Sequence, residues 1–216
     1  MRNPQAQRDL ADPYQLHRTL ARVFPGARAD GDGANEARSP NHGLLFRSEP
    51  DAPGGPAVLV QSLTEPDWSA LEAGYARRID GPKPFDPALE VGQRLRFRLV
   101  ANPTVKKKRP GQKNGARVPL VHDRVPAGHT RATLGYLDWL ERKAEAAGLA
   151  LEADRILDAP FEVRTRKAGG HRITLFGVRF DGTASVDNPD ALADALRGGV
   201  GPAKGLGFGL LSLAMR

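Results

Sequence analysis

The segment RDLADPYQLHRTL holds two side chains that could exchange protons with a substrate, Tyr14 and His17. Residues three apart lie on one face of a helix, and Arg18, four residues after Tyr14, borders the same patch. An imidazole, whose reference pKa is about 6.5, can act as acid or base near neutrality, whereas a phenol, near 10, is a poor base unless perturbed. The phenol can still orient a hydroxyl group or donate to a phosphate oxygen.

RNA cleavage without a metal is one reaction that uses such groups. The ribose 2′-OH attacks the adjacent phosphorus and the 5′-oxygen leaves, which requires a base, an acid and positive charge beside the crowded phosphorus. A tyrosine and a histidine at this spacing also occur in many helices without a catalytic role. The spacing alone therefore leaves open a partly buried pair whose hydrogen bonds are only structural.

The helix that must present these residues is predicted over residues 8–24. Asp12 is a good N-cap, Pro13 suits the first helical position, and Gln15 stands where a capping box has Glu or Gln. The apolar residues of this stretch follow helical spacing and should face the core: Leu16, Leu20, Val23 and Phe24. His17 falls outside this stripe, so we do not expect it to be simply buried.

Basic residues are concentrated in two places on this chain of 216 residues and net charge +7. Residues 94–117 hold nine Lys or Arg and no Asp or Glu, and a second cluster lies at 164–172. The basic residues that we expect to bind a polyanion are Arg94, Arg96, Arg98, Lys106, Lys107, Lys108, Arg109, Arg117, Arg164, Arg166, Lys167 and Arg172. Such clustering favours nucleic acid as the partner, although any one of these side chains could simply be solvated.

A glycine-rich run, GGVGPAKGLGFG, precedes the last apolar stretch. Lys204 stands before Gly205 and Gly207 rather than after the last glycine, so the run is not a P-loop of the Walker type. Its backbone could cradle a phosphate beside Lys204. It could equally be a flexible connection to the last strand.

Strand and helix patterns alternate in two similar halves. We predict strands at 43–49, 57–62, 93–100, 161–167 and 172–180 and near the C-terminus, and helices at 65–75, 130–148 and 188–197 besides the one at 8–24. This pattern predicts an α+β protein with domains at 1–101 and 117–216, joined by a basic linker at 102–116.

The composition excludes several classes of site. The chain has no cysteine, so disulfides, thiolate metal sites and cysteine nucleophiles are absent. His122, Asp123 and His129 have no cluster of carboxylates around them, and we expect no metal or other cofactor. No apolar run approaches the ~20 residues of a membrane helix, and MRNPQAQRDL has no signal core. We expect a cytoplasmic protein that does not bind membranes.

Several segments together resemble the CasE endoribonucleases, which process CRISPR RNA as subunits of type I-E Cascade. These segments follow the family's order and cover most of the chain: RDLADPYQLHRTL, GLLFRSEP, VLVQSLTEPDW, GQRLRFRLVANPT, WLERKAEAAG, FEVRTRK and GVGPAKGLGFGLLSLA. The resemblance implies two tandem ferredoxin-like, RRM-related domains. It also implies metal-independent cleavage of a repeat on the 3′ side of its hairpin, leaving a 2′,3′-cyclic or 3′ phosphate and a 5′-OH.

The resemblance also implies roles for particular residues. Tyr14 and His17 fall on the family's catalytic positions, and the hairpin around Arg164 and Lys167 falls on its element that binds the RNA stem. Lys204 and its glycines fall on the glycine-rich loop. The implied partners are the CRISPR repeat RNA, as precursor and mature crRNA, and other Cascade subunits.

One departure concerns the N-terminus. Family members have a short apolar strand before the RDL segment, whereas MRNPQAQRDL is polar. We therefore expect either a misassigned start or an N-terminal sheet that lacks its first strand. This departure keeps a rival interpretation open, in which the protein is a non-catalytic subunit that only binds hairpin RNA. A third interpretation, a binder of acidic proteins, predicts no preference for hairpin RNA.

Overall fold

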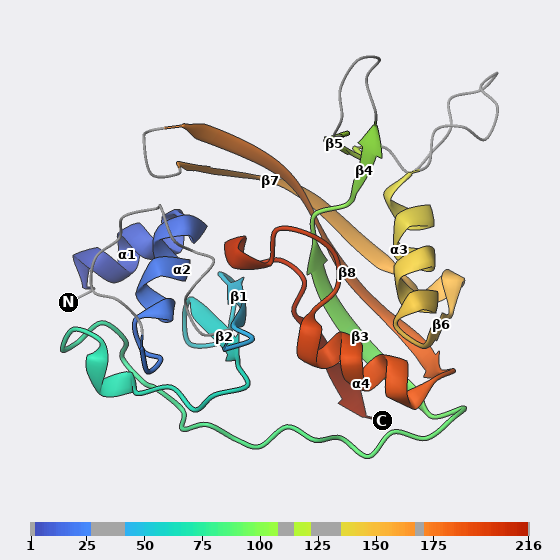
Figure 1. The fold of residues 1–216 in the computed structure, drawn as a ribbon, viewed down its shortest axis with the longest axis horizontal. Coiled ribbons are helices and arrows are strands. Elements are labelled where there is room, and N and C mark those ends of the chain that lie inside the picture. Colours follow the sequence, from blue (N-terminus) through green and yellow to red (C-terminus); the bar gives the residue numbers. More distant parts are fainter. Residues whose placement is uncertain (1–2, 27–41, 108–114, 122–134, 167–170, 216) are drawn as a thin grey trace. The chain divides into compact units, whose positions relative to one another are not determined.

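The computed structural model describes residues 3–26, 42–107, 115–121, 135–166 and 171–215, and it divides into two compact units (Figure 1). Unit 1 contains residues 1–88, 164–174 and 204–207, and unit 2 contains residues 89–163, 175–203 and 208–216. Two short segments from the second half of the chain thus join the N-terminal unit. This division differs from the predicted split at residues 102–116.

Unit 2 is built on an antiparallel sheet of five strands. Its elements are β3 (Arg94–Ala101), α3 (Tyr136–Ala146), β6 (Leu149–Leu151), β7 (Leu157–Arg166), β8 (Arg172–Val186), α4 (Pro189–Gly198) and β9 (Leu211–Met215). The strands lie in the order β6–β8–β3–β9, and β7 also pairs with β8. The four strands of this order, taken with the two helices, follow one another along the chain as strand–helix–strand–strand–helix–strand, which is the ferredoxin-like order, and β7 is an additional strand.

Strand β3 determines which face of this sheet is covered. Leu95, Phe97 and Leu99 are buried and alternate with the arginines along the strand that was predicted at 93–100. Side chains of both helices belong to the same core cluster, among them Leu140 of α3 and Leu192 of α4. The two helices therefore cover the same face of the sheet, and the arginines lie on the other face.

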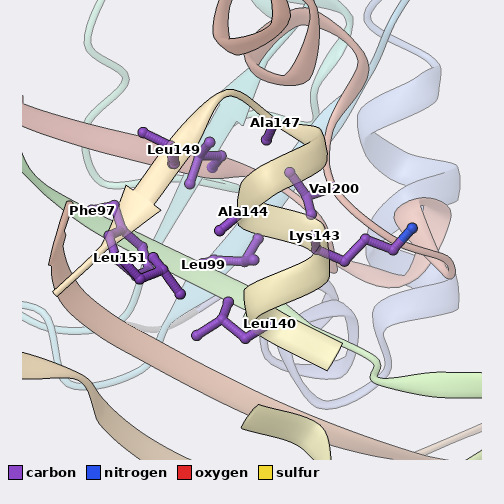
Figure 2. A pocket seen from close by; sticks show the side chains of 10 residues that line it. Phe97, Leu99, Leu140, Lys143, Ala144, Ala147, Leu149, Leu151 and Val200 are labelled. Atoms are coloured by element: carbon purple, nitrogen blue, oxygen red, sulfur yellow. The ribbon is translucent and has the colours of Figure 1, made fainter. Parts of the chain in front are cut away.

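A small apolar pocket remains between α3 and this sheet (Figure 2). Leu140 and Ala144 of α3 line it together with Phe97 and Leu99 of β3, and Lys143 extends away from the other labelled side chains. Apart from Lys143, the lining is aliphatic and aromatic. We assign this pocket to core packing.

The segment expected to be a linker instead forms a second, two-stranded sheet. Strand β4 (Thr104–Lys107) pairs with β5 (Ala116–Pro119) in antiparallel register, and both strands belong to unit 2. Strand β3, which we placed in the N-terminal domain, pairs with β8 and β9 and also belongs to unit 2. Turn-rich composition concealed a short hairpin here, because Lys and Pro are weak strand signals.

Unit 1 contains two consecutive helices and one hairpin. Helix α1 (Pro4–Ala11) is followed by α2 (Pro13–Ala21), and β1 (Leu45–Glu49) pairs with β2 (Ala57–Gln61). The core of this unit joins Leu16 and Leu20 of α2 to Phe46 of β1. The polar residues that precede the RDL segment, where an apolar strand was expected to be missing, are helical from Pro4 onward in α1.

The start of α2 is as predicted. Asp12 is its N-cap, with the Asp12 carboxylate accepting a hydrogen bond from the Tyr14 amide at 3.0 Å, and Pro13 occupies the first turn. The predicted helix at 8–24 is divided at Asp12, because this residue is also the C-cap of α1 and has extended backbone angles. The helix predicted at 188–197 is confirmed as α4, and Asn188 is its N-cap.

The predicted helix at 65–75 is wrong. Only one 3-10 turn, η2 (Trp68–Ala70), forms there, and Leu71 returns to an extended conformation. The Asp67 carboxylate accepts hydrogen bonds from the Ser69 hydroxyl at 2.6 Å and from the Ser69 amide at 3.0 Å. These bonds lower the pKa of Asp67 and favour a local turn over helix propagation.

A buried carboxylate holds the helices of unit 1 to the segment that follows η2. The Asp9 side chain accepts from the Thr19 hydroxyl at 2.7 Å and from the Tyr75 hydroxyl at 2.9 Å. Burial raises the pKa of the Tyr75 phenol, and the hydrogen bond to Asp9 raises it further. Thr19 lies two residues after His17, so this cluster helps to fix the helix that carries the candidate site.

None of the helices in the described parts of the chain combines the length and the apolar character that crossing a bilayer requires.

Replacing Tyr75 by Phe tests this cluster. The variant leaves Asp9 buried with one hydrogen bond fewer, so we expect the free energy of unfolding to fall by about 1 kcal/mol in urea titrations. Arg78→Ala serves as the control, because its ion pair with Asp80 is exposed. Equal stability of the Tyr75 variant and the control would show that the cluster contributes nothing.

Candidate active site

Three segments that are distant in the sequence come together in unit 1. They are helix α2, the parts of β7 and β8 that lie within residues 164–174, and residues 204–207, which contain the 3-10 turn η4 (Lys204–Leu206). Each segment carries residues predicted for one function: Tyr14 and His17, the basic hairpin, and the glycine-rich loop. The fold thus assembles the separately predicted parts in one compact unit.

The His17 ring lies between an aromatic ring and the glycine-rich loop. It is stacked on Phe46, with the ring centroids 6.1 Å apart and the planes inclined by 25°. A Cβ atom built on Gly205 would lie 3.6 Å from Cε1 and 3.7 Å from Nε2 of His17. The backbone of the loop therefore approaches the imidazole closely, and a side chain at position 205 would occupy the space beside Nε2.

Tyr14 and Arg18 accompany His17 on α2. All three side chains are half-buried, whereas Leu16 and Leu20 are 1% and 4% exposed. The predicted separation of a core stripe from a polar patch on this helix is therefore confirmed. The helix begins at Pro13, so Tyr14 lies in its first turn, where partial positive charge favours an anionic ligand.

Gly207 allows the loop to close over the core. Its φ of +81° is unfavourable for residues with a side chain, and a Cβ there would lie 3.2 Å from Cε2 of Phe46. Phe46 is fully buried and supports the His17 ring. Glycine at this position is therefore required by the packing beneath His17.

The hairpin segment presents its arginines to solvent. Arg164, Arg166 and Arg172 are exposed, and Thr165 between the first two is 4% exposed. The Thr165 hydroxyl donates a short hydrogen bond to the Asp12 carboxylate. No sequence signal could have identified this pair, because 153 residues separate its members.

The arginines of β3 are less available than their charge suggests. Arg94 forms a bidentate ion pair with Glu152, whose hydrogen bond raises the pKa of Arg94, and Arg98 pairs with Asp181 at 2.5 Å. Arg96, between them, is exposed. The acidic partners come from distant segments of the chain. The number of basic residues counted in 94–117 therefore overstates the positive potential on this face of the sheet.

The β4–β5 hairpin has the opposite character. Lys106 lies directly across from Arg117 in the strand register, and both are exposed, as is Lys107. Like charges opposite each other destabilise a strand pair. A bound polyanion would relieve this repulsion.

Some predicted residues lie outside the described part of the chain. These are the basic residues Lys108, Arg109 and Lys167 and the residues weighed for a metal, His122, Asp123 and His129. Among the residues that the structure describes, no group of three or more His, Asp or Glu side chains could hold a metal ion.

Comparison with known proteins places the chain in a family. A family model described as "CRISPR associated protein" matches residues 1–215. CRISPR-associated endoribonuclease Cse3 of Thermus thermophilus is 42% identical over 221 residues, which cover 97% of this chain and 93% of that protein. CRISPR system Cascade subunit CasE of Escherichia coli K12 is 31% identical over 94% of this chain and 92% of that protein. The chain belongs to the CasE family of CRISPR-associated proteins.

A solved structure of this CasE family supports the assignment. The structure of CRISPR endoribonuclease Cse3 bound to a 19-nucleotide RNA matches with a TM-score of 0.76 and 40% identity, over 98% of this chain and 94% of that chain. The likeness confirms the predicted fold class, α+β with tandem ferredoxin-like domains. In this CasE-family protein, the described sheet of unit 1 consists of the β1–β2 pair, and Pro4–Ala11 is helical.

Two alanine substitutions in the loop test the packing at His17. Gly207→Ala places a side chain at positive φ against Phe46, so we expect a loss of about 1–2 kcal/mol in the free energy of unfolding. Gly205→Ala brings only ordinary van der Waals contact with the His17 ring and should leave the free energy nearly unchanged. Equal losses in urea titrations would contradict the described loop.

Proposed function

We propose that this protein is a metal-independent endoribonuclease that binds a CRISPR repeat hairpin and cuts the precursor RNA at its 3′ side. The observation that carries the proposal is the assembly of α2, the arginine-bearing hairpin and the glycine-rich loop in one unit, with Gly205 against His17. The relatives named as an endoribonuclease and a Cascade subunit support it. The substrate is a transcript, so the proposed location is the cytoplasm.

The reaction needs an acid and an orienting group from unit 1, together with solvent water. The 2′-oxygen forms a bond to phosphorus and releases its proton to water, while the bond from phosphorus to the 5′-oxygen breaks and that oxygen gains a proton. His17 supplies the proton to the leaving 5′-oxygen, and Tyr14 orients the 2′-OH. The products are a 2′,3′-cyclic phosphate and a 5′-OH.

Positive charge must accompany the phosphorane. Arg18 borders Tyr14 and His17 on α2, and Lys204 adjoins Gly205, which lies against the imidazole. Backbone amides of a glycine-rich turn can also donate to phosphate oxygens. We assign Arg18 and the Lys204 loop to binding the scissile phosphate, and the hairpin arginines to the RNA stem.

The assembly in which the protein acts is part of the proposal. The named relative CasE is a Cascade subunit, and a solved CRISPR RNA-guided surveillance complex contains a chain that is similar to this protein over 95% of its length, with a TM-score of 0.61. We propose that this protein retains its cleaved RNA and remains bound to other Cascade subunits.

Cleavage of repeat RNA in EDTA tests the mechanism. We expect the purified protein to cut the hairpin without metal and to leave a cyclic phosphate, and a 2′-deoxy substitution at the cut nucleotide should stop cleavage while binding persists.

His17→Ala should lower the single-turnover rate by at least about a hundredfold and leave hairpin affinity intact. A requirement for magnesium, or cleavage of the 2′-deoxy substrate, would refute the mechanism. An unmodified protein that binds but never cuts would instead support the rival, a non-catalytic hairpin binder.

Removing one cation from the β4–β5 hairpin should weaken RNA binding without lowering the stability of the protein. Arg117→Ala removes the repulsion with Lys106, so we expect the free energy of unfolding to hold or rise. Loss of a phosphate contact should weaken RNA binding. It should also reduce the slope of log K against the logarithm of salt concentration by about one. Arg94→Ala is the control, because Glu152 already pairs with Arg94 and its removal should change the salt dependence less. Equal salt dependence of the unmodified protein and Arg117→Ala would exclude this hairpin from the RNA contact.

A further inference from the structure

One carboxylate joins the start of α2 to the β7–β8 hairpin. Oδ1 of Asp12 accepts the Tyr14 amide at 3.0 Å and also accepts the hydroxyl of Thr165. Asp12 therefore serves two purposes: it caps the helix that carries Tyr14 and His17, and it anchors a strand that arrives from the other half of the sequence. Both partners belong to unit 1.

The alternation of β7 separates this anchor from the proposed RNA contacts. Thr165 is buried, whereas its neighbours Arg164 and Arg166 are exposed. Successive side chains of a strand point to opposite faces, so the threonine points toward α2 and the two arginines point away from it. The strand thus contacts α2 through one face and leaves the basic face open to a ligand.

We propose that Thr165 is a positioning residue, which holds the helix bearing Tyr14 and His17 in register with the RNA-binding hairpin. The inference rests on the proposed endoribonuclease function. An RNA stem bound by the hairpin arginines is then placed, through Thr165 and Asp12, at a fixed offset from the first turn of α2. Catalysis depends on such offsets, because a displacement of about 1 Å can cost a hundredfold in rate.

The hydrogen bond is suited to this role because its donor, Thr165, is buried. A buried hydroxyl without its acceptor is costly, so the paired arrangement is strongly favoured over a displaced one. The acceptor is charged, which strengthens the bond relative to one between neutral groups. The anchor acts on the end of the helix where Tyr14 lies, within the first turn after the cap.

Thr165→Val removes the hydroxyl while keeping the shape of the side chain. We expect single-turnover cleavage at saturating protein to slow by about tenfold to a hundredfold. The affinity for a 2′-deoxy hairpin, which cannot be cut, should stay unchanged. Thr165→Ser restores a hydroxyl and should recover most of the rate. Thr174→Val, an exposed position on the paired strand β8, is the matched control and should cleave normally.

A second variant separates the bridge from the helix cap. Asp12→Ser keeps a good N-cap but is too short to reach Thr165 in the same way, so it should reproduce the slow cleavage of Thr165→Val. The double variant should be no slower than either single variant, because both remove one interaction. Multiplied defects in the double variant would overturn the inference.

The remaining outcomes distinguish this inference from the proposed function. Normal cleavage by Thr165→Val, or a loss of hairpin affinity equal to its loss of rate, would overturn the positioning role alone. Absence of cleavage by the unmodified protein would overturn the proposed function and this inference with it. If Thr165→Val fails to fold in a thermal melt, Asp12→Ser decides the same question by the same two measurements.

Discussion

The candidate site depends on the close approach of peptide backbone to an aromatic pair. The His17 ring stacks on the buried Phe46, and residues 205 and 207 bring the loop against both rings. Only glycine adopts the φ of Gly207 readily while leaving room for Phe46. The glycines of the C-terminal motif therefore have a steric explanation within the fold, independent of any phosphate that they bind.

Electrostatics in this protein is decided by pairing rather than by the number of charges. The sequence does not distinguish Arg94 and Arg98 from Lys106 and Arg117. In the structure, the first two pair with carboxylates, whereas the last two lie opposite each other. A polyanion gains little from arginines that must first leave an ion pair. The structure thus sorts a uniform basic stretch into a strand face on which Arg94 and Arg98 are paired with carboxylates, and a hairpin on which Lys106 lies opposite Arg117.

Local signals in the sequence predicted what local physics determines. Asp12 and Pro13 specify the start of α2, and the alternation of Leu95, Phe97 and Leu99 with arginines specifies β3. The helix expected at 65–75 failed because Asp67 and Ser69 form a competing turn, which residue patterns only weakly reveal. Partners such as Thr165 and Asp12 could not be predicted, since strand geometry over the whole second half decides where Thr165 lies. For the site, residue types and the α2 face were predictable, whereas the approach of the glycine-rich loop to His17 was not predicted.

The discontinuity of unit 1 has a consequence for the making of the protein. Residues 164–174 and 204–207 reach the N-terminal unit only after most of the chain has been synthesised. Closing such long loops is entropically costly and slow compared with forming the local hairpin β1–β2. A nascent chain on the ribosome can therefore fold α2 early while the histidine still lacks its backbone neighbour. The candidate site is therefore completed only near the end of synthesis, when residues 204–207 join unit 1.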